Sequence, residues 1–319
     1  MKALRLNKGT LELAEIPLPP AGPEALIKVT KAGICGTDLE LVRGYADFSG
    51  VTGHEFVGIV MQSPEDPSLV GRRVVGEINI GCGRCTVCIS GDARHCTARS
   101  VLGIVGCDGA HAEYLRLPSR NLHLVPDGVS DDQAVFTEPL AAAIAAADRT
   151  EISPETEIAV IGDGKLGLLC AMTMAQRSDK VVLIGKHHEK MSTIESLGIS
   201  SIHVDEKNKF LKHFDVVVEA SGSQSGFVTA LDIVRPKGTI VLKSTFHGMM
   251  QWNASRTVVD EISIIGSRCG RFAPALAMLE VGAIPVERLI AARYPLERGV
   301  EAFSHASGRG VLKVLLEVS

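Results

Sequence analysis

The periodicity of hydrophobic and polar positions along the chain changes near residue 130. Up to that point, apolar residues form short runs, such as residues 25–29 and 56–60, separated by prolines and glycines. Such runs are typical of β-strands joined by turns. Beyond it, strand-like runs alternate with segments of helical period. The expected strands are 158–161, 181–184, 215–219, 239–242, 262–265 and 312–318, and the expected helices are 131–148, 165–178, 189–197, 225–234 and 274–282.

This pattern predicts an α/β protein with two domains. Near-continuous apolar strands separated by helices are typical of a parallel sheet that is covered on both faces. A length of 319 residues also favours two domains, since about 100–200 residues is usual for one. We therefore expect a β-rich first domain and a doubly wound parallel sheet in the second.

Composition narrows the classes of partner. The chain has 33 basic and 37 acidic residues, a net charge of −4, and only 4% aromatic residues, so nucleic acid is not an expected partner. The most apolar run, residues 135–147, is interrupted by Glu138 and Pro139 and is too short to span a bilayer. The N-terminus has no apolar core of signal-peptide length. We expect a cytoplasmic protein without membrane contact.

A glycine-rich turn follows the first strand of the second domain. Its residues are Gly162, Asp163, Gly164, Lys165, Leu166 and Gly167. A G-x-G-x-x-G run between a strand and a helix predicts a dinucleotide site, because its glycines permit a tight turn and close approach of the pyrophosphate. The helix N-terminus adds free N–H groups for the phosphates.

The end of the next strand bears on the choice of cofactor. NAD sites usually place an acidic residue there, but this strand ends in Gly185, Lys186 and His187, and no acid appears before Glu189. A small residue followed by cations suits the 2′-phosphate of NADP, so NADP is favoured. The alternative is a solvated turn, with NAD bound without its usual acid or both cofactors used.

Two groups of residues predict zinc. Cys82, Cys85, Cys88 and Cys96 lie within fifteen residues, and four thiolates form a closed tetrahedral site, which indicates a structural zinc. The competing interpretations of the four cysteines are a zinc module that binds nucleic acid and a set of free thiols. The second group, Cys35, His54, Glu55 and Glu138, combines thiolate, imidazole and carboxylate. This set leaves room for an exchangeable ligand, as a catalytic zinc requires.

Taken in order, these motifs resemble the zinc-containing medium-chain dehydrogenases. The anchors are residues 33–38, 53–55, the four cysteines, 108–114, 138–140 and 162–167. The Glu-Pro-Leu element at 138–140 resembles the sorbitol, threonine and archaeal glucose dehydrogenase branch. The resemblance implies a GroES-like catalytic domain of residues 1–138 and 270–319, with a zinc lobe at about 81–97, and a Rossmann domain of residues 139–269.

The resemblance also implies roles for single residues. Cys35 and His54 would bind zinc, while Glu55 and Glu138 would supply the third ligand and a water-holding carboxylate, in either order. Thr37 would begin a proton relay, with Glu40 as a later acceptor. Glu40 stands where threonine dehydrogenases have a histidine, which argues against threonine as substrate.

Two further positions stand out in this comparison. Lys313 lies where relatives often carry a basic residue near the pyrophosphate, so it is an expected cofactor contact. His111 lies at a position that is usually aromatic, where a packing role is expected.

The expected activity is hydride transfer between a nicotinamide cofactor and a small alcohol or carbonyl compound, most simply a polyol, sugar or secondary alcohol. Two zinc ions per chain and a homodimer or homotetramer are also expected. Three alternatives remain at this point. They are a zinc-free quinone or enone reductase, a non-catalytic dinucleotide-binding relative, and a dehydrogenase of a large specialised alcohol.

Overall fold

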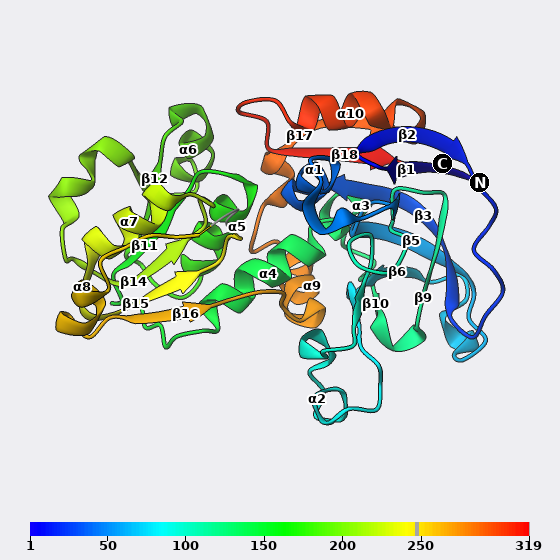
Figure 1. The fold of residues 1–319 in the computed structure, drawn as a ribbon, viewed down its shortest axis with the longest axis horizontal. Coiled ribbons are helices and arrows are strands. Elements are labelled where there is room, and N and C mark those ends of the chain that lie inside the picture. The colour runs from blue at the N-terminus through cyan, green and yellow to red at the C-terminus, as the bar shows by residue number, and fades with distance from the viewer. Residues whose placement is uncertain (246–248, 319) are drawn as a thin grey trace. The chain divides into compact units, whose positions relative to one another are not determined.

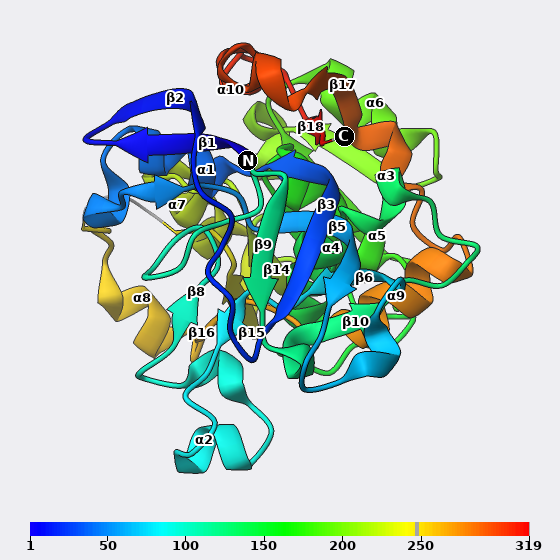
Figure 2. The same cartoon turned by 90° about the vertical axis from the view of Figure 1, so that its right-hand side faces the viewer.

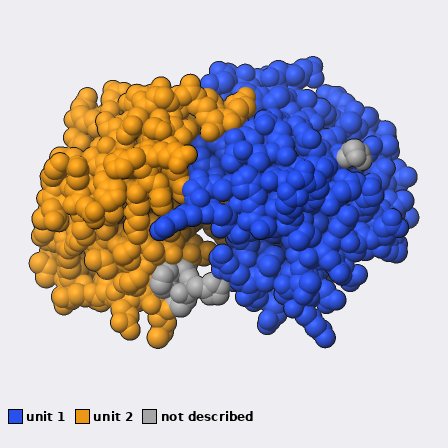
Figure 3. Space-filling model, turned by 90° about the horizontal axis from the view of Figure 1, so that it is seen from above, with its two compact units in different colours: residues 1–138, 275–282, 289–319 blue, residues 139–274, 283–288 orange. Residues whose placement is uncertain are grey.

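The fold is seen in a computed structural model, which describes residues 1–245 and 249–318 (Figure 1). The chain forms two units, coloured separately in Figure 3. Unit 1 comprises residues 1–138, 275–282 and 289–319, and unit 2 comprises residues 139–274 and 283–288. The expected division placed residues 270–319 in the first domain, but residues 270–274 and 283–288 belong to unit 2. Gly270 packs so tightly on the backbone of Ala141 that a Cβ would overlap the Ala141 carbonyl, which holds this segment to unit 2.

Unit 1 is built on a seven-stranded sheet around the long strand β3 (Ala25–Ile34). β3 pairs antiparallel with β5 (Glu55–Gln62), β9 (Tyr114–Leu117) and β18 (Lys313–Glu317). The remaining members are β6 (Arg73–Gly76), β10 (Leu122–Leu124) and β17 (Ile290–Pro295). Because β3 contacts three partners, the residues at its carboxyl end lie beside the starts of β5 and β18.

Smaller elements surround this sheet. A second sheet joins β1 (Lys2–Asn7), β2 (Thr10–Glu15) and β4 (Gly50–Val51). The cysteine lobe contains β7 (Asn79–Ile80), α2 (Thr86–Ile89), a 3-10 turn at Ala93–His95 and β8 (Ser100–Val101). Figures 1 and 2 show α2 standing away from the sheet. Unit 1 also contains α1 (Gly36–Val42), α3 (Asp131–Ala134), α10 (Gly299–Ala306) and most of α9 (Phe272–Glu280).

Unit 2 contains the expected parallel sheet, in the order β13-β12-β11-β14-β15-β16. Its strands are β11 (Ile158–Ile161), β12 (Val181–Gly185), β13 (Ser200–His203), β14 (Phe214–Glu219), β15 (Val234–Leu242) and β16 (Ser263–Gly266). Its helices are α5 (Lys165–Met174), α6 (His188–Glu195), α7 (Gln224–Ile233) and α8 (Ala254–Val259), together with most of α4 (Thr137–Ala147). Buried aliphatic residues of β11, β14 and β15 pack against α7 around Phe214 and Phe227. The α/β fold class is confirmed.

The helix expected at 131–148 is two helices, α3 and α4 (Thr137–Ala147). Pro139 is tolerated because it lies in the first turn of α4, where a backbone N–H has no helical partner. α3 begins with a capping box in which Ser130 and Gln133 bond each other's backbone N–H groups. The expected helix at 274–282 is α9 (Phe272–Glu280), which begins two residues earlier.

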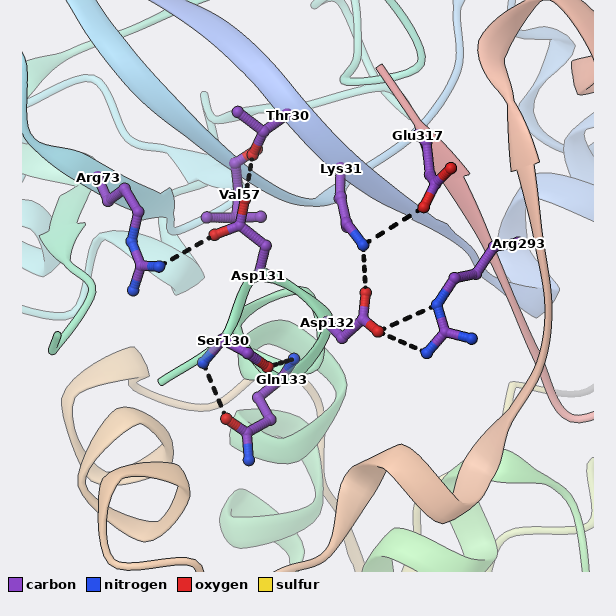
Figure 4. A network of polar contacts seen from close by, with 10 residues as sticks. All are labelled: Thr30, Lys31, Val57, Arg73, Ser130, Asp131, Asp132, Gln133, Arg293 and Glu317. Atoms are coloured by element: carbon purple, nitrogen blue, oxygen red, sulfur yellow. Dashed lines mark hydrogen bonds and ion pairs between the residues drawn. The ribbon is translucent and has the colours of Figure 1, made fainter. Parts of the chain in front are cut away.

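Ion pairs fasten α3 to the strands of unit 1, as Figure 4 shows. Asp132 lies 2.5 Å from the ammonium of Lys31 on β3 and 2.5 Å from the guanidinium of Arg293 on β17. Asp131 accepts a hydrogen bond of 2.8 Å from the hydroxyl of Thr30. Asp131 also lies 3.3 Å from the guanidinium of Arg73 on β6. The segment that leads to Glu138 is therefore anchored at its start to three strands of the sheet.

Candidate metal centres and dinucleotide site

The mixed ligand set gathers at one end of the seven-stranded sheet in unit 1. Cys35 directly follows β3 and is the N-cap residue of α1. His54 directly precedes β5, and Glu55 at the start of β5 is paired with Gly33 of β3. Because β3 and β5 are antiparallel neighbours, ligand atoms of Cys35, His54 and Glu55 lie within 4.8 Å of one another.

Asp38 ties this cluster together, although the sequence analysis gave it no role. Its Oδ2 accepts a hydrogen bond of 2.8 Å from the backbone N–H of Cys35, and its Oδ1 accepts one of 3.2 Å from Gly53. Nδ1 of His54 lies 3.3 Å from the same Oδ1. Burial opposes the charge of Asp38, but His54 and the Cys35 N–H outweigh it and lower the pKa of Asp38. An anionic Asp38 on Nδ1 orients the His54 ring and leaves Nε2 for a metal.

Lys313 lies in this cluster and corrects an expectation. The family resemblance places Lys313 near the cofactor pyrophosphate, but its side chain is buried and its ammonium forms an ion pair with Oε2 of Glu55. Antiparallel pairing of β18 with β3 brings the start of β18 beside Cys35 and Glu55. Burial opposes the charge of Lys313, but Glu55 and Cys35 outweigh it and raise the pKa of Lys313. The ion-pair partner of Lys313 is thus Glu55, which is itself a candidate metal ligand.

The remaining expected residues lie around the cluster rather than within it. The hydroxyl of Thr37 on α1 lies 3.9 Å from the Cys35 sulfur. Glu40, also on α1, pairs with Arg43 at 2.5 Å. Glu138, in the first turn of α4, does not belong to the 4.8 Å group of ligand atoms, but its charge contributes to the raised pKa of Lys313.

The cluster fits a zinc ion. Among the residues that the structure describes, Oε1 of buried Glu55 has no hydrogen-bond partner. A buried carboxylate oxygen without a partner is costly unless a cation or donor meets it. Thiolate, imidazole and carboxylate are the donor types that zinc accepts. Cys35, His54 and Glu55 could therefore hold this ion.

The four cysteines of the lobe also converge. The sulfurs of Cys82, Cys85, Cys88 and Cys96 lie within 4.8 Å of one another. The backbone N–H groups of Arg84 and Cys85 lower the pKa of Cys82 to about 6, which favours the thiolate that a metal binds. Gly81 has no room for a side chain, because a Cβ would lie 2.7 Å from the Cys88 sulfur. The lobe could hold one tetrahedral zinc.

The glycine-rich turn of unit 2 has the geometry of a phosphate-binding loop. Gly162 follows β11 with a φ of 112°, a region that favours glycine. A Cβ on Gly167 would overlap the carbonyl oxygen of Gly162, whereas the space around Gly164 is open. Gly164 is the N-cap of α5, and Lys165 and Leu166 form its first turn. The backbone N–H groups at this helix start could bind a pyrophosphate.

Asp163 holds the turn after β12, a role that sequence reasoning missed. Its Oδ2 accepts hydrogen bonds from the backbone N–H groups of Lys186 at 2.8 Å and His187 at 2.7 Å, and lies 2.9 Å from Nδ1 of His187. A Cβ on Gly185 would lie 2.9 Å from this carboxylate. Lys186 is exposed. The turn therefore presents an exposed cation, and the acid beside it is occupied by backbone donors.

A cavity of about 520 Å³ in unit 1 is lined by residues 46–49 and 104–108. It is tied to the metal-ligand segment, since Oδ1 of Asp108 accepts a hydrogen bond of 2.8 Å from the backbone N–H of Val51. Ala46 and Asp47 adopt left-handed backbone conformations with φ of 62° and 47°. Such strain in non-glycine residues often accompanies a functional loop.

Known proteins share this arrangement. Residues 21–127 match the alcohol dehydrogenase GroES-like domain, and residues 132–318 match the glucose dehydrogenase C-terminus. The chain is 31% identical to a sorbitol dehydrogenase from Halalkalibacterium halodurans, with 99% of each chain covered. The chain belongs to the zinc-containing medium-chain dehydrogenase/reductase superfamily. As a member, it is an oxidoreductase that uses zinc and a nicotinamide cofactor and acts on a small-molecule alcohol or carbonyl compound.

Two solved structures with a similar fold bear on the cofactor. A zinc-binding dehydrogenase from Sinorhizobium meliloti 1021 with NADP bound has a TM-score of 0.91 and 26% identity, covering 99% of this chain and 98% of that chain. A short chain alcohol dehydrogenase from Escherichia coli CFT073 with NADH bound has a TM-score of 0.90 and 27% identity, covering 99% of both. The fold therefore accepts either dinucleotide. These relatives favour none of the three alternatives, which were a zinc-free reductase, a non-catalytic relative and a dehydrogenase of a large specialised alcohol. None of the described helices is long and apolar enough to cross a membrane.

Proposed function

We propose that this protein is a dehydrogenase of polyols or related secondary alcohols, with a catalytic zinc at Cys35, His54, Glu55 and Glu138. The observation that supports it most is the gathering of three ligand types within 4.8 Å, with one Glu55 oxygen left without a hydrogen-bond partner among the described residues. Relatives named sorbitol dehydrogenase and erythritol/L-threitol dehydrogenase support the polyol class.

Different residues of the chain would position the zinc ligands and carry the proton of the substrate hydroxyl. When bound, zinc would act as a Lewis acid on the substrate oxygen, and the nicotinamide would exchange the hydride. Asp38 holds the His54 ring, and the cation of Lys313 offsets the charge of Glu55. Thr37 would accept a hydrogen bond from the substrate hydroxyl and release its own hydroxyl proton toward the cofactor ribose and solvent as it takes up the substrate proton, in keeping with its position 3.9 Å from the Cys35 sulfur. Glu40 would be the later acceptor, exchanging its bond to Arg43.

A second zinc in the cysteine lobe is part of the proposal. Four sulfurs within 4.8 Å would complete the zinc coordination shell. This ion would therefore stabilise the lobe and take no part in the reaction. Each chain would hold two zinc ions, one in each cluster.

NADP is the proposed cofactor. The exposed ammonium of Lys186 follows a strand that ends in glycine, where NAD sites carry an acid. Asp163, an acid beside this turn, is bonded to the backbone of the turn. A homodimer or homotetramer in the cytoplasm completes the proposal, on the ground of the family resemblance. Light scattering of the purified protein checks the assembly.

Absorbance at 340 nm tests the activity. The zinc-loaded protein is mixed with sorbitol, erythritol, other polyols, sugars, secondary alcohols and L-threonine, each with NADP⁺ and NAD⁺. We expect reduction of NADP⁺ with a polyol at a higher kcat/KM than with NAD⁺. Turnover with none of the polyols, or turnover with NAD⁺ alone, would contradict the substrate class or the cofactor respectively.

A further inference from the structure

His111 is a fully buried histidine whose two ring nitrogens both have partners. Nε2 lies 3.2 Å from the carbonyl oxygen of Gly33, and Nδ1 lies 3.0 Å from the hydroxyl of Thr52. A carbonyl can only accept, so Nε2 carries the hydrogen. Nδ1 is then an acceptor for the Thr52 hydroxyl. The neutral ring thus joins two chain segments through one donor and one acceptor.

These two segments carry candidate zinc ligands. Gly33 lies two residues before Cys35, and Thr52 lies two residues before His54. The backbone N–H of His111 also donates to the Thr52 carbonyl at 2.9 Å. The ring packs so closely on Gly53 that a Cβ there would lie 2.5 Å from the ring carbon Cδ2. The side chain therefore fixes the spacing of the two segments just before their ligands.

The surroundings keep the ring in one orientation. The ring of Phe303 packs against it edge to face, with centroids 5.5 Å apart. Burial lowers the pKa of His111 despite the nearby charge of Asp38. A neutral imidazole supplies the acceptor that the Thr52 hydroxyl needs. A phenyl ring could fill the same space, but it could form neither hydrogen bond.

We propose that His111 is a positioning residue of the catalytic metal site, which holds Cys35 and His54 at the separation that zinc requires. This inference rests on the proposed zinc site. It assigns the hydrogen bonds of His111, rather than its bulk, to metal retention. Outer residues that orient metal ligands commonly change metal affinity by about 10–100-fold.

Zinc release to a coloured chelator tests this role in the full-length protein. His111→Phe keeps the ring and removes both hydrogen bonds, while His111→Gln keeps a donor for the Gly33 carbonyl. Thr52→Val removes the partner hydroxyl, and Thr52→Ser restores it. Phe303→Leu is the control for packing. The release phase that belongs to this site is the one that is missing in Cys35→Ser.

We expect His111→Phe and Thr52→Val to release this zinc at least about tenfold faster and to alter the visible spectrum of the cobalt-substituted protein. Thr52→Ser and Phe303→Leu should release it at the wild-type rate, and His111→Gln should fall between. Wild-type release and an unchanged spectrum in both His111→Phe and Thr52→Val would overturn the inference. If His111→Phe does not fold, the Thr52 pair decides. Absence of this release phase from wild-type protein would instead refute the proposed zinc site.

Discussion

At the scale of single residues, the site depends on pairs that are distant in sequence. The sequence predicted the two ligand clusters from different signals. The four lobe cysteines have short spacings, whereas Cys35, His54 and Glu55 combine the ligand types that zinc accepts. Lys313 could not be assigned in this way, since its partner Glu55 lies 258 positions away. Asp163 likewise acts 23 and 24 positions ahead, on the backbone of Lys186 and His187. The only sequence signal for these roles is an ionisable residue inside a strongly apolar or glycine-rich stretch.

Replacing Lys313 should destabilise unit 1. In Lys313→Met the carboxylate of Glu55 stays buried without its cation, and breaking a buried pair in this way costs about 3–5 kcal/mol. Urea unfolding of the metal-free protein should show this loss. The double variant Glu55→Gln/Lys313→Met should recover most of it, because no charge is left uncompensated. Equal stability of Lys313→Met and wild type would mean that the pair contributes nothing.

Reversing the charge of Lys186 should change the cofactor. Lys186→Asp places a carboxylate where a ribose 2′-hydroxyl would bind and where a 2′-phosphate would be repelled. The ratio of kcat/KM with NADP to kcat/KM with NAD should fall about tenfold or more, which is about 1.4 kcal/mol. Lys209→Asp, on an exposed turn of unit 2, is the matched control and should leave the ratio unchanged. An unchanged ratio in Lys186→Asp would remove its proposed contact.

At the scale of elements, a helix or strand could be predicted from the sequence when most of its residues are buried and apolar. The central strands β11, β12 and β14 could be predicted because they are largely buried and nearly all of their residues are apolar. The edge strand β13 was not predicted, since it is mostly polar and partly exposed. The β1–β2 hairpin was not singled out, since its turn uses Lys8 and Gly9 with φ of 47° and 81° instead of the usual Asn-Gly. The break between α3 and α4 also escaped the periodicity, because Val135 and Phe136 are as buried as helix residues. Ion pairs to the sheet fix this break in space.

Asp132 should make the stability of unit 1 depend on pH. Burial opposes its charge, but the hydrogen bonds from Arg293 and Lys31 outweigh burial and lower the pKa of Asp132. A carboxylate with a lowered folded-state pKa stabilises above its ordinary pKa of about 3.9, and that contribution is lost as pH falls through the folded value. Asp132→Asn should therefore cost about 1 kcal/mol at pH 7, measured by urea unfolding.

The difference between Asp132→Asn and wild type should shrink as pH falls below about 4, where the carboxyl of the unfolded chain takes up its proton, and should vanish below the lowered pKa of Asp132 in the folded protein. Asp127→Asn is the matched control, because it changes an exposed carboxylate in the loop before α3. Its stability should stay close to that of wild type at pH 7 and at pH 2. An Asp132→Asn deficit that persists unchanged at pH 2 would show that the contribution is not ionic.

At the scale of the whole molecule, the chain separates its chemistry between two units. Both ligand clusters belong to unit 1, and the glycine-rich turn with its cation belongs to unit 2. The β-rich fold of unit 1 and the parallel-sheet fold of unit 2 could be predicted from the change in hydrophobic periodicity near residue 130. The point where the chain returns to unit 1 could not be predicted, because close backbone contacts such as Gly270 on Ala141 leave no periodic pattern.

The central claim is a catalytic zinc in the cluster of Cys35, separate from a structural zinc in the lobe. The most direct test is the zinc content of purified wild type and Cys35→Ser, measured together with turnover of NADP⁺. Cys170→Ala, a buried thiol of α5 outside both clusters, is the control. We expect two zinc ions per chain and activity in wild type and control. Cys35→Ser should keep one zinc and its fold, but no turnover. Full activity of Cys35→Ser, or two zinc ions retained in it, would contradict the account.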